Sequence, residues 1–290
     1  MSKIIDGKVV AAGIREEVAQ EVEQLPRKKP GLAVILVGND PASQVYVRMK
    51  GKACEQVGIH SITDRLPTEI TESDLLKKVD DYNNDPKYHG LLVQLPLPSH
   101  IDSQKIIEAV NPRKDVDCFH PYNVGRLMIG QPVFLPATPA GIVELLNHYE
   151  IALQGKHVVI LGRSNIVGKP LAMMLVQKSA KANAIVSIVH TAAKDISKFT
   201  RQADILVAAA GSPEVVKGNM VNEGVVVIDV GTNRVDADNE KGYRLVGDVA
   251  FDEVAEKASA ITPVPGGVGP MTIAMLLKNT LMAFRLQESQ

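Results

Sequence analysis

Tyr46 and Lys50 are four residues apart in a segment whose spacing predicts a helix, and side chains four apart share one helical face. That face is offset from the apolar stripe of Val45, Met49 and Ala53, so it could border a cleft. A tyrosine there offers a stacking surface, and a lysine whose pKa is lowered by burial can exchange protons near neutral pH. An ordinary amphipathic helix has the same pattern, and the spacing alone favours that simpler interpretation.

Three further polar side chains stand near expected strand ends or turns. Gln94 interrupts the apolar run 89–95 near its carboxyl end, where a buried amide needs a hydrogen-bond partner. Asp115 and Asp117 alternate in a segment expected to be extended, which puts both carboxylates on one side. They could bind an amine-bearing heterocycle, a metal or neighbouring lysines. Because no cluster of histidines or cysteines completes a coordination sphere, the sequence predicts no metal site.

The segment from Gly162 to Pro170, Gly-Arg-Ser-Asn-Ile-Val-Gly-Lys-Pro, follows an apolar run and opens a predicted helix. A glycine turn in that position lets the phosphates of a dinucleotide approach unpaired N–H groups at a helix start. The spacing is not Gly-x-Gly-x-x-Gly, however, so a plain strand-to-helix turn is an equal alternative.

The end of the next apolar run, 184–189, indicates which dinucleotide would fit. Dehydrogenases that prefer NAD usually carry an acidic residue there, but this run is followed by His190 and Thr191. Arg163 in the glycine turn and the nearby Lys194 supply positive charge that suits a 2′-phosphate. The pattern favours NADP over NAD, unless Arg163 is only a solvated loop charge.

Residues 262–272, Thr-Pro-Val-Pro-Gly-Gly-Val-Gly-Pro-Met-Thr, combine prolines and glycines in an unusual density. Gly266, Gly267 and Gly269 would let a ligand or another chain segment approach the backbone closely. A rigid connection between domains is the alternative.

The elements that would position these residues alternate along the chain. A capping pattern at Thr71 predicts a further helix in the first part of the chain. Apolar periodicity predicts helices over 8–25, from about 41, over 138–149 and over 270–287, and strands over 31–37, 89–95, 157–162, 184–189, 204–211 and 224–231. The alternation indicates an α/β fold with two domains around a cleft, the second a Rossmann-like parallel sheet. The final helix is apolar on most sides, so we expect it to be buried against the first domain.

Composition narrows the class of protein. The chain has 290 residues, with 32 Lys+Arg against 33 Asp+Glu, so no basic field favours nucleic acid or an anionic membrane as a partner. No apolar run is long enough to span a bilayer, and the N-terminus lacks an apolar signal core. Cys54 and Cys118 form no disulfide framework. A cytoplasmic location is expected.

Together these motifs resemble one family, the bifunctional methylenetetrahydrofolate dehydrogenase/methenyltetrahydrofolate cyclohydrolases. The segments that carry the resemblance lie in family order over nearly the whole chain: 43–50 (SQVYVRMK), 90–98 (GLLVQLPLP), 114–117 (KDVD), 162–170 (GRSNIVGKP) and 263–272 (PVPGGVGPMT). Any one of them is a weak signal, but the set is highly specific.

The resemblance implies NADP-dependent oxidation of 5,10-methylenetetrahydrofolate to the methenyl compound, then its hydrolysis to 10-formyltetrahydrofolate. It also implies a homodimer and domains over 1–135 plus 271–290 (folate-binding) and 136–270 (NADP-binding). The implied roles follow the motifs. Tyr46, Lys50 and Gln94 would be catalytic; Tyr46, Asp117, Pro263, Gly266 and Gly267 would bind the folate; and Gly162, Arg163, Ser164, His190, Thr191 and Thr232 would bind NADP.

Two positions depart from the family pattern. Cys118 stands where the family commonly has glycine, and a cysteine is strained if that backbone needs a positive φ. Thr232 replaces a frequent isoleucine, which would weaken an apolar contact to nicotinamide. Three rival functions are a monofunctional NADP dehydrogenase, a catalytically silent nucleotide sensor and a shikimate-type or amino-acid dehydrogenase. The retained Tyr46, Lys50 and Gln94 argue against the first.

Overall fold

The computed structural model describes residues 2–239 and 242–289, which divide into two compact units. The six-stranded unit contains residues up to Ala11 and Thr138–Thr272, and the three-stranded unit contains Ala12–Ala137 and Ile273–Gln290. The expected domain bounds differ from these units chiefly at the first eleven residues, expected in the other domain. Their place follows from strand β1 (Lys3–Ile4), which pairs in parallel with β11 (Ala260–Ile261).

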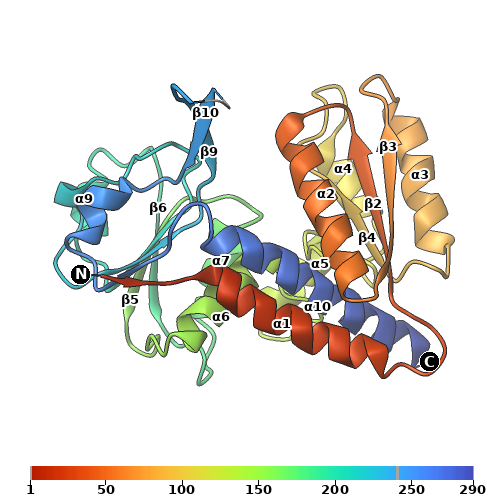
Figure 1. Cartoon of the computed structure of the whole chain (residues 1–290), viewed down its shortest axis with the longest axis horizontal. Coiled ribbons are helices and arrows are strands. Elements are labelled where there is room, and N and C mark those ends of the chain that lie inside the picture. The colour runs from red at the N-terminus through yellow and green to blue at the C-terminus, as the bar shows by residue number, and fades with distance from the viewer. Residues whose placement is uncertain (1, 240–241, 290) are drawn as a thin grey trace. The chain divides into compact units, whose positions relative to one another are not determined.

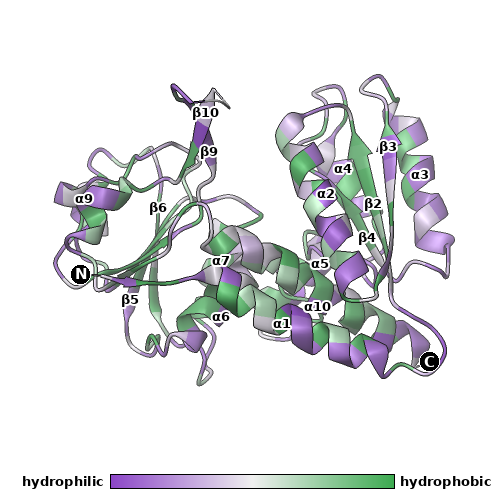
Figure 2. Cartoon of the chain, viewed as in Figure 1, coloured by the Kyte–Doolittle hydropathy of each residue, from purple (hydrophilic) through white to green (hydrophobic). Residues whose placement is uncertain are grey.

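The three-stranded unit contains a parallel sheet in the order β3–β2–β4. The central strand β2 (Gly31–Val37) is buried along its whole length, and β4 (Gly90–Val93) is buried as well, as their apolar runs predicted. Strand β3 (His60–Leu66) was missed because polar residues alternate along it, and Figure 2 shows it more hydrophilic than β2.

Helices flank this sheet, as Figure 1 shows for α2 (Pro41–Gln56) and α3 (Glu72–Asn84). Both begin where the sequence predicted. The Asp40 carboxylate accepts the Ser43 N–H, and the Thr71 hydroxyl accepts the Asp74 N–H. Two short helices, α4 (Ser103–Ala109) and α5 (Pro121–Met128), follow β4 in the part of this unit that ends at Ala137.

Helix α10 (Val268–Glu288) starts in the six-stranded unit, and its residues from Ile273 onward belong to the three-stranded unit. Most of its apolar side chains are buried, including Leu276, Leu277 and Leu281. The buried Asn279 amide donates to the carbonyls of Val116 and Leu135. The helix therefore fixes the loop that contains Asp117. Helix α1 (Gly7–Glu23) also has residues in both units.

The six-stranded unit contains one parallel sheet in the order β1–β11–β8–β7–β5–β6. The predicted strands correspond to β5 (His157–Leu161), β6 (Ile185–Val189), β7 (Ile205–Ala208) and β8 (Val226–Asp229). Its helices are α6 (Ala137–His148), α7 (Gly168–Leu175), α8 (Ser197–Thr200) and α9 (Phe251–Ala255). The expected Rossmann-like parallel sheet is confirmed.

The direction of strand order reverses at β5, because β6 pairs on one side of it and β7 on the other. Open α/β sheets bind ligands outside the carboxyl ends of their strands at such a point. The Gly162 turn follows β5 directly, so the chain itself places the predicted phosphate-binding turn there. An antiparallel hairpin of β9 (Asn233–Asp236) and β10 (Tyr243–Val246), which the sequence did not indicate, follows β8 along the chain. Figure 1 labels both of its strands.

Asp229, the last residue of β8, is a buried carboxyl group at this edge. It accepts the backbone N–H groups of Gly231, Asp248 and Val249. Burial raises the pKa of Asp229 from 3.8 to about 7, although those three N–H groups lower it. The folded protein therefore holds a proton at pH values where the unfolded chain has released it.

This difference predicts a pH-dependent stability. The free energy of unfolding should decrease as pH rises from 3.8 to about 7, because only the unfolded chain releases the Asp229 proton over that range. Between pH 5 and pH 8, release of this proton should lower the free energy of unfolding by about 3 kcal/mol. The Asp229→Asn variant cannot ionise, so its urea-unfolding free energy should fall less over that range. Equal slopes for both proteins would contradict a raised pKa.

Candidate active site

Lys50 is a buried charged residue of the three-stranded unit. It lies on the inner face of α2 with Ser43, Val47 and Cys54, and only 6% of its surface is exposed. Burial lowers the pKa of Lys50, and attraction to the Asp117 carboxylate partly opposes that effect. A lysine in such a place can reach its neutral form at a lower pH than an exposed one.

Gln94 provides the hydrogen-bond partner. The Lys50 ammonium donates to Gln94 Oε1 at 3.1 Å, and Gln94 Nε2 donates to the Leu95 carbonyl at 2.8 Å. The second contact fixes the amide with its oxygen toward the lysine. Helix α2 and the end of β4 thus bring together two of the predicted site residues from 44 positions apart.

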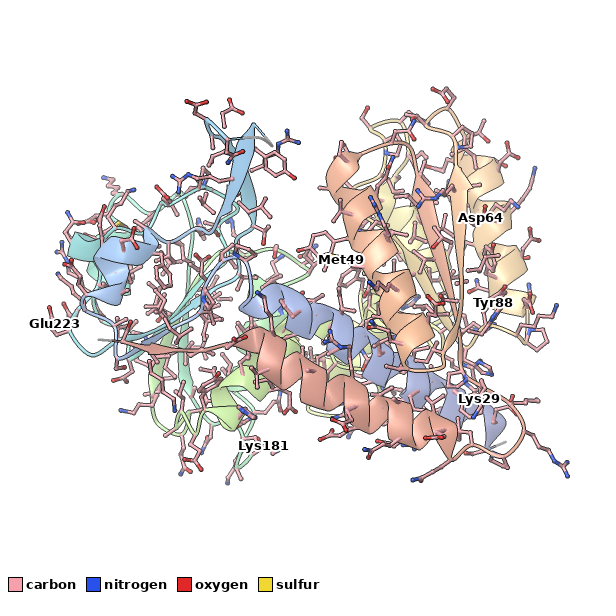
Figure 3. The ribbon with its side chains drawn as sticks, in the orientation of Figure 1. Lys29, Met49, Asp64, Tyr88, Lys181 and Glu223 are labelled. Atoms are coloured by element: carbon pink, nitrogen blue, oxygen red, sulfur yellow. The ribbon has the colours of Figure 1, made fainter. Side chains whose placement is uncertain are left out.

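The helical face was predicted wrongly in one respect. Val45 and Met49 were expected in a buried stripe, but each is 47% exposed. Figure 3 labels Met49 on α2. Ala53 of that stripe is buried as expected, but the other buried positions include Val47, Lys50 and Cys54, so the lysine occupies a core position rather than one beside it. Tyr46 is partly buried, one position from that face.

The segment with Asp115 and Asp117 is a turn, contrary to the extended conformation expected. The Cys118 N–H donates to the Asp115 carbonyl at 3.1 Å, which closes it. The Asp115 carboxylate accepts N–H groups of Phe119 and His120 and the Asn123 amide, so its acceptor positions serve the local backbone. Asp117 is the partly exposed carboxylate, and its interaction with Lys50 lowers a pKa that burial raises more strongly.

Cys118 has a φ of 60°, so this backbone does adopt the left-handed region. Its side chain is buried, and the thiol donates to the Phe134 carbonyl at 3.3 Å. Burial raises the pKa of this thiol, which keeps it protonated and unreactive. The departure from the family pattern thus combines backbone strain with a compensating buried contact.

The Gly162 turn is built for close approach of the backbone. Gly162 has a φ of 136°, and a Cβ there would overlap the Ala209 carbonyl at the end of β7. A Cβ on Gly168, the first residue of α7, would overlap the Gly162 carbonyl. The Ser164 hydroxyl accepts the Val167 N–H at 3.1 Å. These contacts hold a tight strand-to-helix turn in front of a helix N-terminus.

The charged and polar residues predicted for coenzyme binding belong to the same unit. Arg163, Ser164 and Thr191 are exposed, and His190 Nδ1 accepts the Ala192 N–H at 3.3 Å. Thr232 is exposed in the segment between β8 and β9. Because the side chains of Arg163, Ser164, Thr191 and Thr232 are exposed, a ligand could reach them without displacing packed residues.

The 262–272 glycines are explained partly by packing within the protein. A Cβ on Gly267 would come within 2.7 Å of the Thr262 side chain, and Gly266 has a φ of 119°. The Gly7 N–H donates to the Gly266 carbonyl at 3.0 Å. Pro263, Gly266 and Gly267 lie in the six-stranded unit, whereas Tyr46, Lys50, Gln94 and Asp117 lie in the other.

Comparison with known proteins identifies the family. A model of the tetrahydrofolate dehydrogenase/cyclohydrolase NAD(P)-binding domain matches residues 136–288, and a model of the catalytic domain matches residues 5–117. The chain belongs to the tetrahydrofolate dehydrogenase/cyclohydrolase family. The resemblance seen in the motifs is therefore confirmed.

Relatives of this family match over the full length. A "Bifunctional protein FolD" from Geotalea uraniireducens is 56% identical, covering 98% of this chain and 99% of the relative. The crystal structure of the bifunctional enzyme FolD from Campylobacter jejuni is 50% identical, with a TM-score of 0.93 over 99% of this chain and 100% of that one. A Trypanosoma brucei FolD structure complexed with NADP cofactor and inhibitor is 42% identical, with a TM-score of 0.94 over 100% and 99%.

Within residues 2–239 and 242–289, no helix has the length and apolar character to cross a membrane, and no three His, Cys, Asp or Glu side chains gather as metal ligands would. Sequence reasoning missed the buried carboxylates Asp229 and Asp248. Their signal was an acid at the end of an apolar strand and an acid preceded by glycine, at Gly247.

The positive φ of Cys118 predicts that a glycine at this position stabilises the protein more than an alanine does. Cys118→Gly should unfold at higher urea concentration than Cys118→Ala, by about 1 kcal/mol, because only glycine adopts the left-handed conformation without strain. Gly13, a residue of α1 with nothing near its Cβ position, is the control, since alanine should there be the more stable residue. Alanine above glycine at both sites would contradict the strain at Cys118.

Proposed function

We propose that this chain is a bifunctional enzyme of one-carbon metabolism, as its family membership and intact site residues support. It oxidises 5,10-methylenetetrahydrofolate to 5,10-methenyltetrahydrofolate with NADP, and it hydrolyses that product to 10-formyltetrahydrofolate. The observation that carries the proposal is the buried Lys50 hydrogen-bonded to an oriented Gln94, beside Asp117. A dehydrogenase without hydrolase activity has no need of that arrangement.

The oxidation removes hydride from a carbon between two nitrogens, whose lone pairs stabilise the cation that forms. That step needs alignment more than a base. NADP, when bound, supplies the hydride acceptor. The chain's residues fit such a group: the tight Gly162–Gly168 turn stands directly in front of the N-terminus of α7, and the exposed Arg163 and Thr191 suit a 2′-phosphate. His190, Ser164 and Thr232 complete the proposed coenzyme site.

The hydrolysis adds water to the methenyl carbon and opens the ring, so protons must move. Lys50 serves this step, since burial lowers its pKa and Gln94 Oε1 holds Nζ in place. Asp117 is the proposed partner of the pterin, and Tyr46 stacks on the folate. Pro263, Gly266 and Gly267 are the proposed further contacts to the substrate.

Lys50→Met separates the two activities. Methionine suits the buried position but moves no proton, so hydrolysis of methenyltetrahydrofolate should fall by about 100-fold or more, while NADPH formation from methylenetetrahydrofolate stays within about threefold. The exposed Lys52 of the same helix gives the matched control, Lys52→Met, which should retain both activities.

The assay follows absorbance of NADPH and, without coenzyme, decay of methenyltetrahydrofolate. Wild-type protein is run with NADP and with NAD, and NADP should give the faster reaction. Absence of reduction with either coenzyme would overturn the dehydrogenase assignment. Equal loss of both activities in a folded Lys50→Met protein that binds folate would overturn the role of Lys50.

The proposal includes a cytoplasmic homodimer formed through the six-stranded unit. Both cysteines are free, which fits a reducing compartment. Strand β6 lies at one end of the sheet order, and Ile185 and Ile188 are 62% and 38% exposed on it. Two copies related by a twofold axis can pair such edge strands and cover those side chains.

Ile185→Lys should therefore weaken dimerisation by placing charge on the paired edge. Analytical ultracentrifugation should show monomer at concentrations where the wild type is dimeric. Ile129, 67% exposed at the end of α5 in the three-stranded unit, gives the control Ile129→Lys, which should stay dimeric. A dimer in all three proteins would rule out this edge as the interface.

A further inference from the structure

Asp248 is a fully buried residue of the six-stranded unit, and its carboxylate accepts hydrogen bonds from two loops. Oδ2 accepts the N–H groups of Ala210 and Gly211 at 2.6 and 2.9 Å. Oδ1 accepts the Ser212 N–H at 3.0 Å and the Asn233 amide at 2.9 Å. One carboxylate thus accepts hydrogen bonds from four donors, so these donors are paired even when no ligand is bound.

The surrounding backbone is shaped for this carboxylate. A Cβ on Gly231 would overlap Asp248 Oδ1, so glycine is the residue that leaves it room. A Cβ on Gly247 would overlap Asp229 Oδ2 in the same way. Asp229 in turn accepts the N–H of Asp248 itself at 2.9 Å, which fixes the backbone that presents Asp248. Asp229 thus fixes the backbone of Asp248, and the Asp248 carboxylate fixes the two loops; we call this pair the carboxylate clamp.

The clamped loops lie at the ligand-binding edge of the sheet. Residues 209–212 follow β7, and Gly231–Asn233 follow β8, so both stand at carboxyl ends of neighbouring parallel strands. The Ala209 N–H donates to the Leu161 carbonyl at 2.8 Å, and Ala209 adjoins the Gly162 turn. Displacement of loop 209–212 would therefore reach the phosphate-binding turn.

We propose that Asp248 is a positioning residue of the dehydrogenase step. It acts through loop 209–212 and Asn233, which it holds beside the coenzyme site, and has no part in hydrolysis. The inference rests on the proposed function, since it assigns Asp248 to the coenzyme half of that activity. Oxidation needs alignment of two reactants, so loop placement is the property on which its rate depends most.

Charge and shape are both required of this residue. A carboxylate is an acceptor at both oxygens, whereas an asparagine amide turns an N–H₂ group toward donors that already carry hydrogen. Asp248→Asn therefore sets N–H₂ against either Ala210 and Gly211 or Ser212 and Asn233. Gly231→Ala leaves the charge intact and displaces the carboxylate by the added methyl group.

The experiment measures both variants beside the wild type and the control Asp252→Asn, an exposed aspartate of α9. Calorimetric titration should show the Kd for NADP raised about tenfold or more in both variants. Dehydrogenase kcat at saturating NADP should fall about 100-fold, as misalignment predicts. Methenyltetrahydrofolate hydrolysis without coenzyme should stay within twofold of the wild type.

Amide hydrogen exchange on the coenzyme-free protein reports the clamp directly. The amides of Ala210, Gly211 and Ser212 should exchange faster in both variants than in the wild type. Their exchange rates should be unchanged in Asp252→Asn. Unaltered exchange, Kd and kcat in Gly231→Ala would overturn the inference even if Asp248→Asn failed to fold. Hydrolysis lost in step with oxidation would overturn it too. A wild type that forms no NADPH would defeat the proposed function instead, so the two failures are distinct.

Discussion

The desolvated ammonium group of Lys50 is the constraint on which the three-stranded unit depends. A buried charge is costly unless partners surround it, and the lysine and its two partners here come from three places in the chain. Helix α2 provides the lysine, the end of β4 provides Gln94, and the 115–118 turn provides Asp117. Each must be held firmly, because a small displacement would leave the charge unpaired.

That requirement explains contacts that otherwise look incidental. The Asp40 cap fixes the start of α2, and the Leu95 carbonyl fixes the Gln94 amide. The Asp115 carboxylate accepts N–H groups of the residues that follow the turn, and Asn279 of α10 donates to the Val116 carbonyl within it. Cys118 adds a buried thiol contact at a position where the backbone is strained. These polar groups thus determine the geometry of the site, although none of them has a proposed catalytic role.

The fold could be predicted from the sequence where burial is continuous and failed where it is mixed. Apolar runs predicted β2, β5 and β7 because both faces of a parallel sheet are covered. Strand β3 and the β9–β10 hairpin are rich in polar residues and contain no apolar run, so both were missed.

The site shows the same limit. Motifs located Lys50, Gln94 and the Gly162 turn, because the residue types themselves suggest chemistry. The inner face of α2 was assigned to Val45 and Met49, since periodicity treats a lysine as a surface residue. Asp229 and Asp248 escaped notice because their role depends on backbone N–H groups brought together only by folding. The periodicity of apolar residues predicts which side chains are buried, but it does not predict hydrogen bonds to backbone N–H groups that are distant in the sequence.

The division of residues between the units bears on how two reactions coexist in one chain. Lys50, Gln94 and Asp117 all belong to the three-stranded unit, whereas the glycine turn and the carboxylate clamp belong to the six-stranded unit. The proton handling and the hydride alignment that we propose would therefore rest on separate hydrogen-bond networks, each formed within its own unit. Changes that disturb one network leave the other's contacts intact, because no residue of either set is shared. Independent networks of this kind let one reaction be tuned, or lost, without refolding the half that serves the other.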